Sequence, residues 1–256
     1  MQNKFDVIIP CHPKDFDTLN LVIEGVQKNL NYNEIFVVTP ALVAGYGHPN
    51  VTFVLDNIYY DHLDIEKIKD KLKSSNRPGR FGWLFQQGIK LLSHRVLEEL
   101  TESYLCLDAD TIFTRPVEFN TDKFQYLKVE EYHRPYLETY NKLYDSRSCG
   151  FSMISHHMMF NKTYMEELIS SIESKHDSSF TDALLKSIDV NQKSTFSEWD
   201  LYGNFMLLHH GDVCKLRELK WYNNVTNIPS EWELEQYQNV YDFVSTHAHK
   251  RKITNG

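Results

Sequence analysis

The sequence is short of long hydrophobic runs and of basic charge, and each shortage excludes a class of protein. No apolar stretch approaches the ~20 residues that a membrane-spanning helix needs. Acidic residues outnumber basic ones by 35 to 27, for a formal net charge of −8, which argues against nucleic acid as the main partner. If so acidic a protein handles phosphates, it needs a metal ion or a local basic cluster to receive them.

Cysteine is also scarce. The four cysteines are far apart and form no CxxC pair: Cys11, Cys106, Cys149 and Cys214. We therefore expect free thiols in a reducing compartment and no disulfide framework. The opening stretch MQNKFDVIIPCHPKD is charged and strand-like and does not resemble a signal peptide. These observations predict a cytoplasmic protein with no transmembrane segment.

The first 110 residues alternate short apolar runs with helical patterns. Apolar runs predict buried strands at 4–10, 34–40, 51–56 and 104–110. Apolar residues at helical spacing predict helices at 19–30, 63–72 and 81–100. This alternation predicts an α/β fold with a mostly parallel central sheet and helices on both faces. Ligands of such sheets bind beyond the carboxyl ends of the strands.

The second half is less regular. Two short strands, paired as a hairpin, are expected at 114–119 and 124–129. A loop and a strand are expected within 148–162, and helices at 162–174, 180–188 and 196–210. A last strand is expected at the start of 243–251. No repeat or linker divides the chain, so we expect a single domain over residues 1–256 with an elaborated C-terminal half.

The run YLCLDADTIF (104–113) ends in two aspartates separated by Ala109. In an extended backbone, residues i and i+2 point to the same side, so Asp108 and Asp110 can reach one ligand while Ala109 faces away. Their carboxylates supply the hard oxygen ligands that Mg²⁺ and Mn²⁺ prefer. The alternative is a solvated turn, because Asp is common at strand ends.

The longer segment YLCLDADTIFTRPVEF resembles the DxD segment of GT-A glycosyltransferases, which use nucleotide sugars. DVIIPCHPKD, GRFGWLFQQGIKL and SEWDLYGNF agree in order along the chain. Together they resemble the small glycosyltransferase-like family of bacteria and of large DNA viruses of algae. The resemblance implies a GT-A-like fold and a cytoplasmic enzyme of a bacterium or of a virus's host. It also implies a nucleotide-sugar-binding half, 1–115, and an acceptor-binding half, 116–256.

The resemblance implies that Asp108 and Asp110 hold Mn²⁺ or Mg²⁺ against the diphosphate of the donor, with a UDP-sugar as the expected donor. The ion would act as a Lewis acid on the leaving group. In GT-A enzymes a C-terminal histidine often completes the coordination, and STHAHKR offers both His247 and His249. Lys250 follows and can contact phosphate oxygens. The alternative for this segment is a solvated basic tail.

Other donor-binding candidates follow the first strand and precede the DxD segment. The resemblance places base and ribose near PCHPKD, with Pro10, His12 and Lys14 as candidates, and places Ala109 beside the donor. The helix at 81–100 carries an aromatic, two amides and a cation on one face: Trp83, Gln86, Gln87 and Lys90. With Arg77 and Arg80 it suits phosphates and sugar hydroxyls. The alternatives are a plain strand exit and an ordinary amphipathic helix.

The candidate general base lies in TFSEWDLYGNFM. If Ser197 caps a helix, Asp200 stands at the capping-box position, and Glu198 is left to face the cleft as the base of an inverting transfer, with Asp200 as second choice. Residues two apart on a helix point about 200° apart, so only one faces the acceptor. The alternative is two helix-start acids favoured by the dipole. Adjacent His156 and His157 should point to opposite faces, and one is expected in the acceptor site.

Three other functions compete with this one. A haloacid-dehalogenase-type phosphatase also uses DxD, but its motif usually lies near the N-terminus and has Thr or Val where Ile112 stands here. A nucleotidyltransferase normally has a glycine-rich basic loop after the first strand, and PCHPKD has no glycine. A non-catalytic nucleotide-sugar or carbohydrate-binding protein would bind the donor with metal and release no nucleotide.

Overall fold

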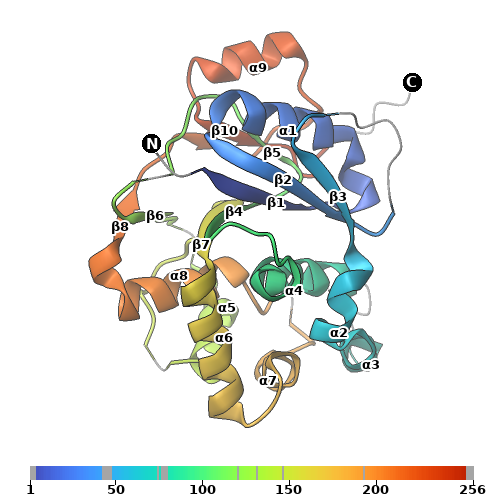
Figure 1. The fold of residues 1–256 in the computed structure, drawn as a ribbon, viewed down its shortest axis with the longest axis vertical. Coiled ribbons are helices and arrows are strands. Elements are labelled where there is room, and N and C mark those ends of the chain that lie inside the picture. Colours follow the sequence, from blue (N-terminus) through green and yellow to red (C-terminus); the bar gives the residue numbers. More distant parts are fainter. Residues whose placement is uncertain are drawn as a thin grey trace.

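The computed structural model describes residues 4–41, 48–73, 75, 80–119, 121–130, 132–145, 147–192 and 194–251. Its centre is a five-stranded sheet of strand order β3-β2-β1-β4-β7 (Figure 1). The strands are β1 (Phe5–Pro10), β2 (Tyr32–Thr39), β3 (Val51–Leu55), β4 (Ser103–Leu107) and β7 (His157–Asn161). Strands β1 to β4 are parallel and β7 is antiparallel to β4. The predicted α/β fold with a mostly parallel sheet is confirmed.

Helices cover both faces of the sheet, as predicted. One face carries α1 (Phe16–Asn29), and the other carries α4 (Phe81–Val96), α6 (Lys162–His176) and α8 (Glu198–His209) (Figure 1). Successive side chains of β1 enter opposite apolar clusters: Val7 and Ile9 join the α1 cluster, whereas Ile8 joins the α4 cluster. This alternation is the period-2 geometry of a strand buried on both faces.

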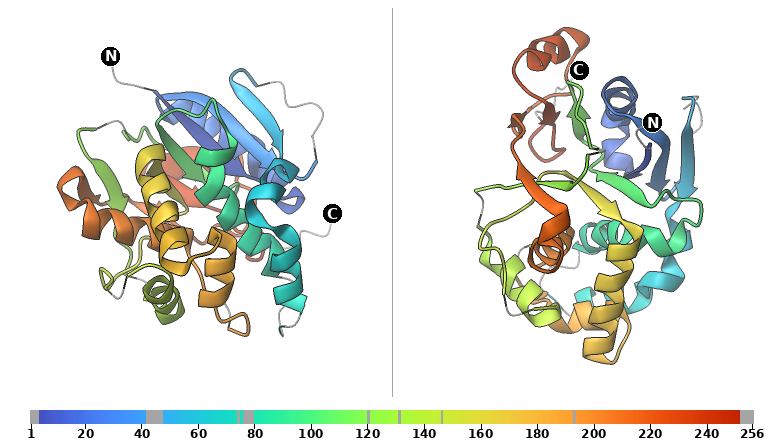
Figure 2. Two further views of the ribbon diagram at one scale, coloured as in Figure 1. Left: turned by 60° about the horizontal axis from the view of Figure 1, so that its bottom comes forward. Right: turned by 60° about the vertical axis from the view of Figure 1, so that its left-hand side comes forward.

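The remaining helices lie around this core. They are α2 (Tyr60–Leu63), α3 (Ile65–Lys73), α5 (Arg134–Leu143), α7 (Phe180–Ser187) and α9 (Glu231–Gln238), with 3₁₀ turns at Pro13–Asp15, Asp56–Tyr59 and Gly211–Val213. The sequence pattern did not indicate α5 or α9. Helix α9 has no fully buried residue and packs on the α1 cluster through the partly buried Leu234 and Tyr237. It lies at the opposite end of the molecule from α7 (Figures 1 and 2).

The hairpin expected at 114–119 and 124–129 is wrong. Residues 114–119 form no strand, and β6 (Phe124–Leu127) pairs in parallel with the distant β8 (Cys214–Arg217). The strand after the DxD turn, β5 (Thr111–Phe113), pairs antiparallel with β10 (Phe243–Ser245), and β10 pairs in parallel with β9 (Trp221–Tyr222). Apolar runs show that a strand exists but do not identify its partner. The partners of β6 and β5 could not be predicted, because β8 and β10 lie far away in the sequence.

This small sheet positions the candidate site. Because β10 runs antiparallel to β5, the chain leaving β10 passes the residues that precede β5, and Thr246 N–H donates to Asp110 O at 2.9 Å. Gly25 lets α1 approach β5 closely, since a Cβ there would lie 3.0 Å from Phe113 O.

Among the described residues, no helix has the length and apolar character needed to cross a membrane. All four cysteines are free.

Candidate active site

The two aspartates of the DxD segment lie in a turn just beyond the carboxyl end of β4. Strand β4 ends at Leu107, and Thr111 N–H donates to Asp108 O at 3.1 Å. The extended backbone expected for these residues is therefore wrong. Ala109 is buried in the α1 cluster, where its carbonyl accepts a hydrogen bond from Thr18 Oγ1 at 2.9 Å. Tertiary contacts, and not strand periodicity, decide where the two carboxylates point.

Lys90 joins Asp108 to Glu198. Its Nζ lies 2.5 Å from Asp108 Oδ1 and 2.6 Å from Glu198 Oε1, and it sits 4.1 Å from the centre of the Trp199 ring. The Lys90 and Glu198 side chains are only 3% and 5% exposed. One buried ammonium thus pairs with a buried carboxylate, Glu198, and with a partly exposed one, Asp108. Lys90 was predicted to bind the donor; in this structure both of its close ionic partners are protein carboxylates.

The pKa values of this triad follow from burial and pairing. Burial lowers the pKa of Lys90, but the charges of Asp108 and Glu198 outweigh burial and raise it above the ordinary value. Burial raises the pKa of Asp108, but Lys90 and His156 outweigh it, and the net shift is downward. For Glu198, burial wins over the attraction of Lys90, and its pKa is raised. Two carboxylates beside one cation therefore differ in their readiness to accept a proton.

Glu198 opens α8, as the capping pattern predicted. Ser197 Oγ accepts the Asp200 N–H at 3.2 Å, and Glu198 N–H donates to Gln87 Oε1 at 3.2 Å. The Asp200 carboxylate, which is 2% exposed, accepts hydrogen bonds from Met153 N at 2.7 Å and Ser152 Oγ at 3.1 Å. Asp200 therefore ties α8 to the loop before β7. The sequence analysis expected Glu198 to be free to face the cleft. The structure instead pairs its carboxylate with Lys90.

Asp110 meets the chain that follows β10. Its Oδ2 lies 2.8 Å from His247 Nδ1, and its Oδ1 is buried without a hydrogen-bond partner. The sequence left His247 and His249 as alternatives, and the structure brings His247 to the carboxylate. The His249 ring stacks on the His247 ring, with centroids 5.6 Å apart. The other ring nitrogen of His247 is hydrogen-bonded to Asn223 Oδ1, from a residue that the sequence analysis did not single out.

His156 and His157 separate, as expected for adjacent residues. His156 Nδ1 lies 3.1 Å from Asp108 Oδ2, and its backbone has a left-handed φ of 60°, which is uncommon outside glycine and concentrates at functional sites. His157 is 2% exposed, and burial lowers its pKa well below the ordinary value. His157 packs against three phenylalanines: Phe113, Phe119 and Phe243. Only His156 of the pair therefore borders the aspartates.

A row of aromatic rings runs beside the DxD turn. Trp221 contacts His156 with ring centroids 5.6 Å apart, and His156 contacts His247 at 4.8 Å. Because His156 binds Asp108 and His247 binds Asp110, the two carboxylates flank one pair of imidazoles. Trp221 was missed because a single Trp in a two-residue strand gives no pattern from which a site can be inferred.

The donor-binding residues predicted near the end of β1 differ in their contacts and exposure. Gln86 Nε2 donates to Pro10 O at 3.4 Å, which joins α4 to the end of β1. His12 and Lys14 are exposed in the following turn. Burial, with the nearby charges of His247, Lys250 and Lys14, lowers the pKa of His249 despite the opposing effect of Asp110. The basic groups near His249 thus come from both ends of the chain.

Two of the predicted donor-binding cations, Lys250 and Arg80, are hydrogen-bonded to other parts of the protein. Lys250 Nζ donates to Asn223 O and Asn224 Oδ1, each at 2.9 Å. Arg80 donates to Ser194 Oγ at 2.6 Å, and its guanidinium lies 4.5 Å from the centre of the Trp83 ring. Arg80 and Trp83 therefore stand about two turns of α4 before Lys90. Arg77 lies outside the described residues.

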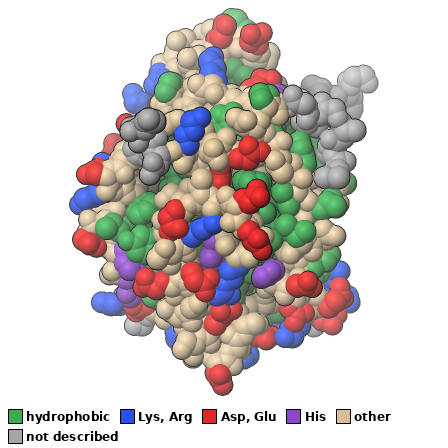
Figure 3. All heavy atoms as spheres, viewed as in Figure 1, with side chains coloured by type: hydrophobic (Ala, Val, Ile, Leu, Met, Phe, Trp, Pro, Cys, Tyr) green, Lys and Arg blue, Asp and Glu red, His purple; other side chains and the backbone are tan. Residues whose placement is uncertain are grey.

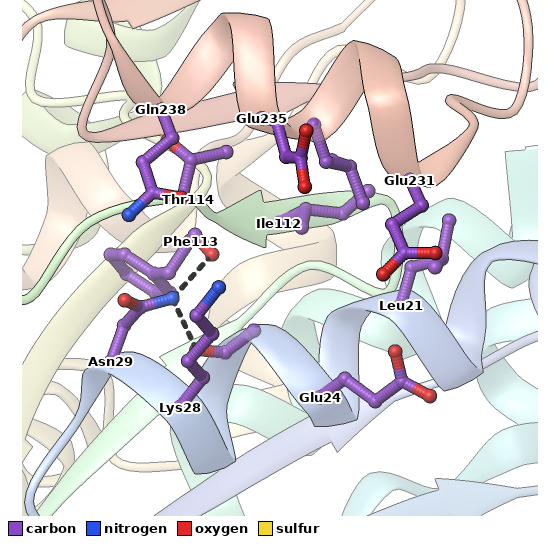
Figure 4. Close-up of a pocket in the computed structure, with 12 residues that line it drawn as sticks. Leu21, Glu24, Lys28, Asn29, Ile112, Phe113, Thr114, Glu231, Glu235 and Gln238 are labelled. Atoms are coloured by element: carbon purple, nitrogen blue, oxygen red, sulfur yellow. Dashed lines mark hydrogen bonds between the residues drawn. The ribbon is translucent and has the colours of Figure 1, made fainter.

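A separate groove lies between α1, β5 and α9 (Figure 4). Its volume is about 180 Å³, and its rim carries Glu24, Glu231 and Glu235 against a single cation, Lys28. Three carboxylates suit a diphosphate poorly, and the residues lining this groove are different from those predicted for the donor. On the face shown in Figure 3, charges of both signs are interspersed. We therefore place the candidate site at the DxD turn.

The fold of this chain is similar to that of a glycosyltransferase of known structure. The crystal structure of mouse xyloside xylosyltransferase 1 in its apo form matches with a TM-score of 0.52 and 9% sequence identity, over 98% of this chain and 100% of that one. The chain therefore has a glycosyltransferase-like fold. A family model matches residues 66–252, so the chain belongs to that family, which is described as a family of unknown function (DUF6492). No curated protein matches the sequence.

Proposed function

We propose that the protein is a metal-dependent glycosyltransferase. It transfers a sugar from a nucleoside diphosphate sugar, a UDP-sugar in our proposal, to a hydroxyl of a glycan or other acceptor, with inversion. The observation that carries the proposal is the joining of two pairs at the carboxyl end of β4: Asp110 with His247, and Asp108 with Glu198 through Lys90. Strand ends of parallel sheets are where this fold class binds ligands.

A divalent cation fits the Asp110–His247 pair. Adjacent ligands of an octahedral ion with bonds of about 2.1 Å are roughly 3 Å apart, and Asp110 Oδ2 and His247 Nδ1 are 2.8 Å apart. The buried, unpartnered Asp110 Oδ1 offers a further ligand atom. Within the described part of the chain, no group of three or more His, Cys, Asp or Glu side chains is placed to hold a metal. The diphosphate and water would complete the coordination.

Mn²⁺ or Mg²⁺ bound here would stabilise the leaving nucleoside diphosphate as a Lewis acid. The residues around it have separate tasks in this proposal. Asp108 is engaged by Lys90 and His156, so it orients these two groups beside the ion. Lys14 is exposed and Lys250 partly exposed, and both lie near His249, where they are the proposed contacts to phosphate oxygens. Pro10 and His12, at the end of β1, are candidates for contacts with the base and ribose.

Glu198 is the proposed general base. It accepts the proton of the acceptor hydroxyl as that oxygen bonds to the anomeric carbon and the bond to the diphosphate breaks. Its pKa is raised by burial, which makes a carboxylate a better proton acceptor. Asp200 is the weaker candidate, because Met153 and Ser152 hold its carboxylate. His156, beside Asp108 and Trp221, is the proposed contact to the acceptor.

The test is a screen of nucleotide sugars for nucleotide release with Mn²⁺, first with water and then with sugar acceptors. Glu198→Gln should lower transfer roughly 10²- to 10⁴-fold, the usual contribution of a positioned base, with donor affinity little changed. Glu231→Gln, on exposed α9, is the matched control. Donor binding without any release of nucleotide would instead identify a non-catalytic nucleotide-sugar-binding protein.

A further inference from the structure

The segment 246–251 after β10, which we call the C-terminal strap, is held from two sides. On one side, Lys250 Nζ binds Asn223 O and Asn224 Oδ1, each at 2.9 Å. On the other side, a guanidinium nitrogen of Arg251 lies 3.5 Å from Asp15 Oδ1. His247 belongs to this strap, and both of its ring nitrogens face oxygen atoms: Nδ1 faces Asp110 and Nε2 faces Asn223.

We infer that Asn223 is a positioning residue that presents His247 Nδ1 to a divalent cation at Asp110. The inference rests on the proposed metal-dependent function. An imidazole binds a metal through a nitrogen without a proton, and its other nitrogen then carries a proton that needs an acceptor. The amide oxygen of Asn223 is at that second nitrogen. Asn223 thereby selects both the ring orientation and the tautomer in which Nδ1 is free to coordinate.

The sheet explains why these two residues meet. Strands β9 and β10 are parallel, with Tyr222 opposite Val244. The residues just after the two strands therefore leave the same edge of the small sheet, Asn223 from one strand and the strap from the other. His249, the other histidine of the strap, is exposed. Asn223, the residue after β9, thus contacts His247, which is the histidine that contacts the Asp110 carboxylate.

The experiment is titration of the metal-free protein with Mn²⁺ by isothermal calorimetry, with no nucleotide present. Asn223→Leu removes the acceptor at similar size and should weaken Mn²⁺ binding about 10- to 100-fold, the usual effect of losing an outer-shell partner. Asn223→Asp keeps an acceptor and should bind at least as tightly as the wild type. Asn224→Leu and Asn224→Asp are matched controls, because Asn224 binds Lys250 and not the histidine.

Thermal unfolding of each variant shows that the affinities refer to folded protein. Wild-type affinity in Asn223→Leu would overturn the inference, and so would equal losses in Asn223→Leu and Asn224→Leu, which would point to the strap as a whole. Weak binding by Asn223→Asp would show that the amide donates to the ring, which also overturns it. Absence of Mn²⁺ binding by the wild type would overturn both the inference and the metal dependence. Mn²⁺ binding without nucleotide release would overturn only the proposed transfer.

Discussion

Replacing Lys90 by Met should destabilise the protein strongly, because it leaves two carboxylates beside each other without their cation. Met preserves most of the volume and the contact with Trp199. The side chains of Lys90 and Glu198 are 3% and 5% exposed, and Asp108 is 18% exposed, so water can replace the ammonium only in part, on the side of Asp108. Removing one partner of a buried ion pair typically costs about 3–5 kcal/mol. We expect a loss of that size in the free energy of unfolding at pH 7.5.

The loss should depend on pH in a defined direction. In the wild type the pKa of Asp108 is lowered, so its contribution is present above the unfolded pKa of about 3.9 and is lost as the pH falls further. Without Lys90, burial of Asp108 is opposed only by His156 and burial of Glu198 loses its opposing cation, so both pKa values should rise relative to the wild type and acid should relieve the unpaired charges. The difference between Lys90→Met and wild type should therefore shrink from pH 7.5 to pH 4.5.

Urea denaturation followed by circular dichroism measures both effects. Lys69→Met is the control, because Lys69 forms an exposed pair with Glu66, and exposed pairs contribute about 0–1 kcal/mol. Glu198→Gln should cost less than Lys90→Met, because it leaves one cation with one carboxylate. If Lys90→Met costs no more than Lys69→Met, or costs more at pH 4.5 than at pH 7.5, the buried triad is not an ionic cluster and the reasoning fails.

Two further predictions concern the aspartates. Asp110→Ala should abolish Mn²⁺-dependent nucleotide release while the circular dichroism spectrum stays native, and EDTA should have the same effect on the wild type; full activity in EDTA would refute the metal dependence. Asp200→Ala should cost about 1.5–3 kcal/mol in urea denaturation, since it leaves the Met153 N–H without its charged acceptor, and Asp200→Asn should cost less. If Asp200→Asn is inactive yet as stable as the wild type, the roles proposed for Asp200 and Glu198 are reversed.

The sequence alone determined the main sheet and the start of α8, for local reasons. Apolar runs bounded by turn residues mark buried strands, and helical periodicity marks α1, α4 and α6, because both patterns record which side of an element faces the core. The cap of α8 was also readable, since Ser197 binds the N–H three residues on. The acidic turn could be located for the same reason: Asp108 and Asp110 follow the buried run Tyr104–Leu107.

The tertiary structure decided which side chains these aspartates meet. His247 could not be separated from His249 by sequence, because the choice depends on the antiparallel pairing of β5 with β10, more than 120 residues apart. Asn223 gave no signal, because its role arises only from the parallel pairing of β9 with β10. The Lys90 bridge between Asp108 and Glu198 likewise spans separations of 18 and 108 residues. Local patterns report burial and hydrogen bonding along one element, whereas charge pairing across elements depends on how the whole chain packs.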